Sequence, residues 1–210
     1  KIECVSAGVE LRMNCEVSKI YKREDGFHIT LDGGGIKAQS LVIATGGLSI
    51  PKIGATGFGY QIAQQFKINV LNQRAGLVPL VFDKGLLERC KRLSGLSLDA
   101  RVACAGTAFQ EGLLFTHRGL SGPSILQISS YWRDSHSVSV DLSPGHDVSA
   151  HLINGKATHP RQEVSTCLAD ILPKRLATEL CDLVGVFGRL ADRSDLHLHK
   201  LGQLVNDWQL

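Results

Sequence analysis

Several features that would assign this chain to a familiar class are missing from its 210 residues. The six cysteines form no C-x-x-C pair, so neither a disulfide framework nor a structural zinc site is indicated. We expect reduced, mostly buried thiols in a cytoplasmic protein. No apolar run reaches the roughly 18 residues that a membrane span needs, and no signal peptide opens the chain. We therefore expect a soluble protein without a membrane partner.

The chain also has little excess of positive over negative charge. The net charge is +3, and lysines and arginines are interspersed with acids instead of forming a block. Charge alone therefore predicts no nucleic-acid partner. The chain begins with Lys1 and not with methionine, from which we expect a piece of a longer protein.

A short apolar run that ends in two glycines is the most informative segment. The sequence Leu-Val-Ile-Ala-Thr-Gly-Gly occupies residues 41–47. Its β-branched residues predict a buried parallel strand over residues 41–44 that ends at Thr45, Gly46 and Gly47. Glycine has no Cβ and accepts positive φ, so these N–H groups could face a phosphate or a ring edge. A tight turn without any ligand is the alternative interpretation.

The rest of the chain shows three successive patterns of apolar and polar residues. The first forty residues predict short strands at 9–13 and 16–20 and then an antiparallel meander, because apolar and polar residues alternate between Asp25-Gly26 and the glycines at 33–35. A helix capped by Thr56 should follow, with a stripe at Phe58, Ile62, Ala63 and Phe66.

From about residue 77 the pattern is mainly β. It comprises an extended segment at 78–82, a hairpin over 98–115 and a strand at 138–142. Between them a glycine-bearing loop leads into a helix with Pro123 in its first turn. From about residue 151, and clearly after 158, the spacing is helical. The last helical stripe ends at Trp208, and Asp192 or Ser194 is its expected cap.

Residues 41–47, their continuation through Ala-Thr-Gly-Phe-Gly-Tyr-Gln-Ile-Ala at 55–63, and residues 114–132 carry a resemblance. They resemble the aminoacetone oxidase-like, or BaiN/YhiN-like, family of bacterial FAD-dependent oxidoreductases. The resemblance implies a multi-part α+β fold. Residues 1–76 would be part of an FAD-binding α/β domain, followed by an insert made of a small β-barrel (77–150) and an α-helical bundle (151–210).

The chain departs from the family at both ends. The N-terminal G-x-G-x-x-G turn, which holds a pyrophosphate on a helix N-terminus, is absent, and so is the closing glycine-rich segment. The glycines between 54 and 59 have the wrong spacing to replace it. The resemblance thus implies the middle of an enzyme that oxidises a small amine or reduces an enone-like substrate, with NAD(P)H as a candidate electron donor. The oligomeric state is left open.

Five residues are predicted to contact FAD by this resemblance: Val17, through its backbone to the adenine, and Ala44, Thr45, Gly46 and Gly47. A strand valine without ligand is the alternative for Val17.

His117 is the predicted catalytic residue, because a histidine near a flavin can donate a proton or hold an anionic substrate. The alternative is a hydrogen-bonded structural histidine. Arg118 could bind a carboxylate or be solvated, and Ser121 and Gly122 could offer N–H donors or serve only as a cap.

Other classes of protein agree less well with the sequence. His197 and His199 have the spacing of metal ligands on a strand, but their surroundings are helical and no third ligand stands out, so we predict no metal. The chain could instead be an interaction module without activity. A nucleic-acid-binding barrel is disfavoured because no basic-aromatic stripe is visible. A hydrolase is disfavoured because G-x-S-x-G is absent around Ser121.

Overall fold

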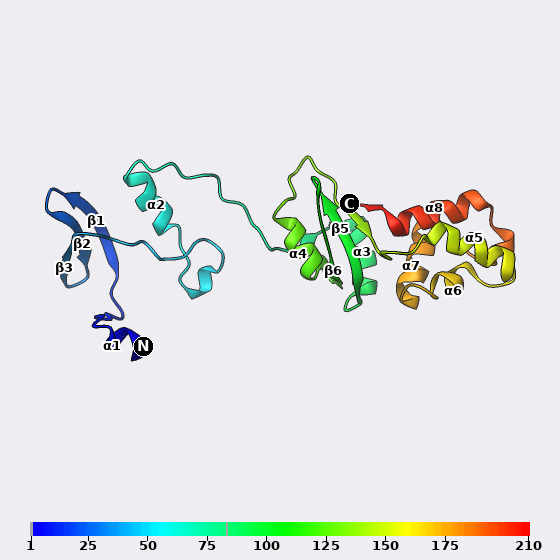
Figure 1. Ribbon diagram of the computed structural model, residues 1–210, viewed down its shortest axis with the longest axis horizontal. Coiled ribbons are helices and arrows are strands. Elements are labelled where there is room, and N and C mark those ends of the chain that lie inside the picture. The colour runs from blue at the N-terminus through cyan, green and yellow to red at the C-terminus, as the bar shows by residue number, and fades with distance from the viewer. Residues whose placement is uncertain (1, 83) are drawn as a thin grey trace. The chain divides into compact units, whose positions relative to one another are not determined.

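Residues 2–82 and 84–210 are described by the structure, a computed structural model, and they divide into two units (Figure 1). Unit 1 comprises residues 1–73 and unit 2 comprises residues 74–210. Each unit has its own hydrophobic core. None of the helices in the described parts of the chain has the length and apolar character that crossing a bilayer requires.

Unit 1 contains the predicted antiparallel meander. Its strands are β1 (Val17–Arg23), β2 (Gly26–Leu31) and β3 (Gly34–Ala38), in the order β1-β2-β3. Gly26 has φ +125°, and a Cβ there would lie 2.5 Å from the carbonyl oxygen of Ala38, so only glycine fits this turn. Preceding the meander, helix α1 (Ile2–Ser6) is short. The strand predicted at residues 9–13 is wrong, since this segment has no regular structure.

The core of unit 1 is small. Ile20 and Ile29 of the meander are buried together with Ile62 of helix α2 (Phe58–Gln65). The Gln65 side chain ties the helix to the sheet by donating to the carbonyl of Ile20 at 2.7 Å. A 3-10 turn, η1 (Pro51–Ile53), precedes the helix.

The cap of α2 differs from the prediction. The N-cap residue is Gly57, and the Thr56 hydroxyl lies one position earlier, where it accepts a hydrogen bond from the N–H of Phe58 at 3.4 Å.

The strand predicted at residues 41–44 is also wrong in this chain. These residues pair with no strand of the described part of the chain, and Val42 is 84% exposed. A parallel strand depends on neighbours that are distant in sequence for its hydrogen bonds, and an apolar run without such neighbours cannot form a ladder.

Unit 2 is built on a six-stranded antiparallel sheet with the order β4-β7-β6-β5-β8-β9. The hairpin of β5 (Ser97–Cys104) and β6 (Thr107–Thr116) confirms the predicted one, and α4 (Pro123–Ser129) begins at Pro123 as expected. The remaining strands are β4 (Leu80–Val81), β7 (Gly119–Ser121), β8 (Ser139–Asp141) and β9 (Trp208–Gln209). Trp208 was predicted in a helix, but it pairs with Val140 of β8.

Helices complete unit 2. Helix α3 (Lys84–Leu93), between β4 and β5, was missed by the sequence analysis. Figure 1 shows the other helices gathered beside the sheet: α5 (Val148–Thr158), α6 (Val164–Leu168), α7 (Lys174–Val184), the 3-10 turn η2 (Leu190–Asp192) and α8 (Asp195–Asn206). The helical region therefore begins at residue 148, three residues before the predicted start at about 151. Ser194 caps α8 by accepting from the N–H of His197 at 3.3 Å, which confirms one of the two expected caps.

A single core joins the sheet to the helices of unit 2. It contains Val102 and Phe115 of the sheet, Leu152 of α5 and Leu201 of α8, each at most 1% exposed. Phe115 stacks on Trp208 with ring centroids 6.3 Å apart. The β-rich and helical segments of unit 2 are therefore stabilised by the same apolar contacts and should unfold together.

Gly202 tests how tightly α8 packs on α5. A Cβ at Gly202 would lie 2.3 Å from Ser149 Oγ and 2.7 Å from Ser149 Cα. We expect Gly202→Ala to lower the free energy of unfolding by about 1 to 3 kcal/mol, because the two helices must move apart. Urea denaturation followed by circular dichroism measures it. The matched control is Gly85→Ala in α3, where a Cβ meets nothing within 4 Å, and it should be neutral or stabilising by up to about 1 kcal/mol. Equal losses in both variants would contradict this account.

Candidate cofactor and substrate site

The predicted cofactor segment lies in unit 1 between the meander and α2. Ala44, Thr45 and Gly46 are exposed. Gly46 has φ +74°, and a Cβ placed on it would meet nothing within 4 Å. Among the described residues, no N–H group of residues 42–50 donates to a backbone carbonyl. Gly46 is therefore an open glycine in an exposed segment, where an anionic or planar group could approach the backbone.

Two neighbouring glycines are explained by packing within unit 1. A Cβ on Gly47 would lie 3.0 Å from Tyr60 Oη, and one on Gly59 would lie 3.3 Å from Thr45 Oγ1. The segment thus packs on the first turn of α2. Of the paired glycines, Gly46 is the one whose conformation has no packing explanation in the described part of the chain.

Val17 is the first residue of β1, where the ladder with β2 is irregular. The register shifts between Val17 and Lys19, and the Ser18 hydroxyl donates to the Thr30 carbonyl at 3.3 Å. Such irregularities are frequent beside binding sites. The Val17 side chain is half-buried against the small core.

His117 lies in unit 2, in the two-residue turn between β6 and β7. Its side chain is exposed and makes no hydrogen bond to any described residue. The turn itself is fixed, because the Thr116 hydroxyl donates to the Gly119 carbonyl at 3.0 Å and accepts from the N–H of Arg118 at 3.2 Å. A rigid turn therefore carries an imidazole whose two nitrogens are available to a substrate.

The glycines that follow His117 serve the packing of unit 2. A Cβ on Gly119 would lie 2.1 Å from the Leu80 carbonyl oxygen, and one on Gly122 would lie 2.5 Å from the Gly112 carbonyl oxygen. Both have positive φ, +145° and +96°. The Gly-Leu-Ser-Gly-Pro segment is therefore required for the close approach of β4, β6 and α4, and the N-terminus of α4 faces the sheet.

The predicted site residues consequently lie on both units. Val17 and residues 44–47 belong to unit 1, whereas His117 and Arg118 belong to unit 2. Within unit 1 the structure brings Thr45 against α2. Within unit 2 it joins the His117 turn to the start of the unit, because the Arg118 carbonyl accepts from the N–H of Phe82 at 3.2 Å.

A cluster that the sequence did not indicate lies between α5 and α6 and consists of His151, Cys167 and Asp170. His151 Nε2 lies 3.0 Å from the Cys167 carbonyl oxygen and 3.8 Å from Asp170 Oδ2. The Nε2 atom of His151 is already engaged by the Cys167 carbonyl oxygen, so His151 is explained as a structural link between α5 and α6. Spacing could at most have paired Cys167 with Asp170, which are three residues apart at the end of α6, because His151 comes from α5. His197 and His199 lie on α8, so the strand needed for their ligand spacing is absent there.

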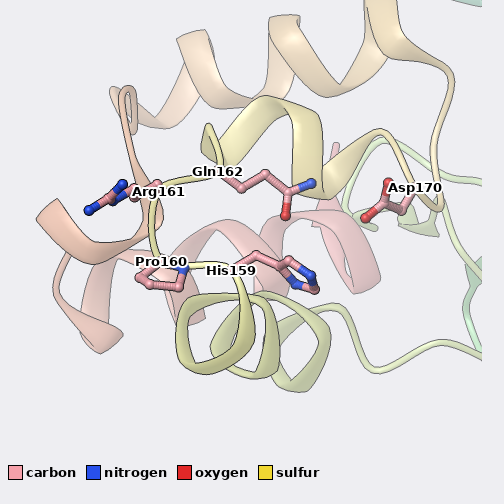
Figure 2. Close-up of a pocket in the computed structure, with 5 residues that line it drawn as sticks. All are labelled: His159, Pro160, Arg161, Gln162 and Asp170. Atoms are coloured by element: carbon pink, nitrogen blue, oxygen red, sulfur yellow. The ribbon is translucent and has the colours of Figure 1, made fainter.

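Beside this cluster is an open pocket of about 680 Å³. Figure 2 shows His159 and Gln162 extending toward Asp170, whose carboxylate points back toward them, whereas Arg161 points away. The Thr158 hydroxyl lies 2.9 Å from His159 Nδ1 and orients this ring.

The cysteines are free, and four of the six are buried, which confirms the expectation of mostly buried thiols. Burial raises the pKa of the Cys90 and Cys181 thiols to about 11, and it also raises the pKa of Cys104 and Cys167. These four thiols are therefore protonated at neutral pH and are poor nucleophiles.

Comparison with known proteins matches residues 74–210 to the family described as HI0933-like protein barrel and H2TH domain. These are the residues of unit 2. The chain is 44% identical over 214 residues to the ribosomal RNA dihydrouridine synthase of Escherichia coli (strain K12), covering 99% of this chain and 52% of that protein. It is 38% identical over 219 residues to the protein of the same name from Haemophilus influenzae, covering 100% of this chain and 53% of that protein.

The chain thus spans about half the length of these curated relatives. The matched family agrees with the resemblance drawn from the motifs, but neither relative is named for an amine substrate. Both are named for ribosomal RNA, which runs against the expectation that nucleic acid is not a partner.

Proposed function

We propose that this chain, which belongs to the HI0933-like family, is the central part of a flavin-dependent oxidoreductase that converts uridine in ribosomal RNA to dihydrouridine. One observation carries the proposal: essentially the whole chain matches two proteins named for that reaction, at 44% and 38% identity. The proposed RNA substrate differs from two expectations drawn from the sequence, a small-amine substrate and the absence of a nucleic-acid partner.

The reaction agrees with the other substrate that was expected, an enone-like molecule. Dihydrouridine differs from uridine by two hydrogens added across the C5=C6 bond of the base. That bond is conjugated with the C4 carbonyl, so it is the ring equivalent of an enone. Its reduction needs a hydride and a proton, and it does not need a protein nucleophile, in keeping with the protonated thiols of unit 2.

Residues 44–46 fit a flavin cofactor, because their main chain is exposed and Gly46 leaves open space where a side chain would stand. Thr45, Gly46 and Gly47 would contact FAD, with Val17 near the adenine. FAD when bound supplies the two-electron reduction. His117 would hold and deliver a proton to the base, since its imidazole is exposed on a rigid turn.

The same proposal assigns the parts of the chain. Residues 1–76 would belong to the FAD-binding domain of a cytoplasmic enzyme, and residues 77–150 and 151–210 would form the β-barrel and helical parts of its insert. NAD(P)H would be the electron donor. Since the chain spans about half of its relatives, these assignments concern the longer protein of which it would be the middle, called the parent protein below.

The experiment that tests the function follows NAD(P)H oxidation by the parent protein without oxygen. Absorbance of the nicotinamide should fall when unmodified ribosomal RNA is added, and it should not fall with RNA that already carries dihydrouridine at the target position. Equal oxidation with a small amine or a simple enone, and none with RNA, would contradict the proposed substrate.

The 210-residue chain on its own should bind FAD weakly or be colourless when purified. The chain contains no G-x-G-x-x-G turn, so its exposed segment at 44–47 would supply only part of the contacts that hold a dinucleotide. The visible absorption spectrum measures this, with the parent protein as the control. A flavin spectrum with one FAD per chain would show that the chain binds the pyrophosphate of FAD without a G-x-G-x-x-G turn.

A further inference from the structure

Unit 2 has a groove of about 1140 Å³ where the two open edges of its sheet come near each other. Within the described part of the chain, the outer strands β4 and β9 each have one neighbour in the sheet. Leu80 and Phe82 line the groove from one edge, and Val138 and Leu210 line it from the other. Val138 and Leu210 exchange two backbone hydrogen bonds of 2.9 Å, which closes this side.

The walls of the groove are held together by two serines at the end of α4. The Ser129 hydroxyl accepts from the N–H of Val78 at 3.0 Å, and the Ser130 hydroxyl accepts from the N–H of Leu77 at 3.3 Å. Ser129 is only 6% exposed and also donates to the Leu126 carbonyl at 2.7 Å. The segment that carries Arg74 into the groove is thus fixed to the segment that carries Trp132, so the groove is preformed.

An exposed indole lies at the rim. Trp132 is 37% exposed, and its Nε1 donates to the His136 carbonyl at 2.8 Å. This bond fixes the orientation of the ring, and the exposed third of the residue is available to a stacking partner. The neighbouring Tyr131 is 45% exposed and packs against Phe109 with centroids 5.7 Å apart.

Positive charge accompanies the indole. Arg74 and Arg133 both line the groove, and within the described residues neither forms a salt bridge, in contrast to Arg89 and Arg92 on α3. The Arg133 guanidinium donates from Nη1 to the carbonyls of Ser130 and Trp132, at 3.1 and 2.6 Å, which orients the group and leaves its other nitrogens available. Among the described residues that line the groove, Asp134 is the one acidic residue.

Resting on the proposed function, we infer that this groove binds a single-stranded segment of the RNA substrate. Trp132 stacks on a base, and Arg74 and Arg133 contact phosphates. A single strand fits better than a duplex, because a base must leave its stack to lie on an indole face, and base-aromatic stacking next to arginine is how proteins hold unpaired strands. The basic-aromatic surface could not be seen as a stripe in the sequence, since its parts come from residues 74–82 and 131–136.

The test measures binding of the 210-residue chain to a short fluorescein-labelled oligouridylate by anisotropy. We expect Trp132→Ala to weaken binding roughly tenfold, whereas Trp132→Phe keeps most of the affinity because the ring still stacks. A plot of the logarithm of the binding constant against the logarithm of the salt concentration has a negative slope. The double variant Arg74→Gln/Arg133→Gln should make this slope less steep by about 1.4, since each phosphate contact on a single strand contributes about 0.7. Arg101→Gln, an exposed arginine of β5 outside the groove, is the matched control and should leave the slope unchanged.

A spectroscopic readout separates stacking from loss of structure. Trp208, the other tryptophan, is 7% exposed, so quenching of indole fluorescence by the RNA should vanish in Trp132→Phe while binding persists. The inference is overturned if the Trp132 and arginine variants bind like the unaltered chain, if Arg101→Gln loses as much, if duplex RNA binds equally well, or if the unaltered chain binds no RNA. The proposed function fails independently, when the parent protein forms no dihydrouridine.

Discussion

Replacing Gly46 by valine should abolish retention of FAD by the parent protein. Gly46 has φ +74°, which a β-branched residue rarely adopts, and its open side is where the cofactor would approach. The two methyl groups of valine would occupy that space. The strain alone costs about 1 to 3 kcal/mol, and the lost contact adds to it. The ratio of flavin absorbance to protein concentration after purification measures the effect.

Gly8→Val is the matched control for this variant. Gly8 also has φ +74°, and a Cβ there also meets nothing within 4 Å, so backbone strain is the same. We expect the Gly8 variant to keep its flavin. If both variants lose flavin equally, strain and not cofactor contact explains the result. If Gly46→Val stays fully yellow, the assignment of this turn to FAD is wrong.

Replacing His117 by alanine should lower turnover of the parent protein roughly 100-fold or more while the flavin is retained. This is the size of effect expected when a positioned proton donor is removed. The side chain contacts no described residue through a hydrogen bond, so its loss should leave the fold of unit 2 intact. Flavin content and single-turnover rates of dihydrouridine formation give the two readouts.

His199→Ala provides the comparison for His117. His199 is exposed on α8, distant in sequence from the turn, and belongs to none of the predicted sites. Its variant should turn over like the unaltered protein. Normal turnover in His117→Ala would return this residue to a structural role in the loop, and loss of flavin in that variant would contradict the separation of the two functions.

Local patterns predicted the parts of the fold that depend on local interactions. The meander followed from alternation and from the turn signals at Asp25-Gly26 and at the glycines 33–35, and the structure has the turns at residues 24–25 and 32–33. The hairpin of β5 and β6 followed in the same way. Helix α3 was missed although Leu86, Cys90 and Leu93 have helical spacing and charged residues lie between them, which is the pattern of an amphipathic helix and was sufficient to predict it.

Local sequence patterns could not predict the elements that depend on partners distant in the sequence. The apolar run at residues 41–44 reads as a strand, but a parallel strand forms only where its neighbours are present. Trp208 continues a helical stripe, yet pairing with Val140 draws it into the sheet. The groove of unit 2 unites Arg74 with Trp132, and only the folded chain brings them together.

The mass of the uridine nucleosides in ribosomal RNA treated with the parent protein shows whether the proposed reaction occurs. Unmodified RNA would be incubated with the protein, FAD and NADPH, digested to nucleosides and analysed by mass spectrometry. We expect a nucleoside heavier than uridine by two hydrogens, formed at one position and absent with the Gly46→Val protein. Unchanged uridine throughout the RNA, with the flavin bound and reduced, would contradict it.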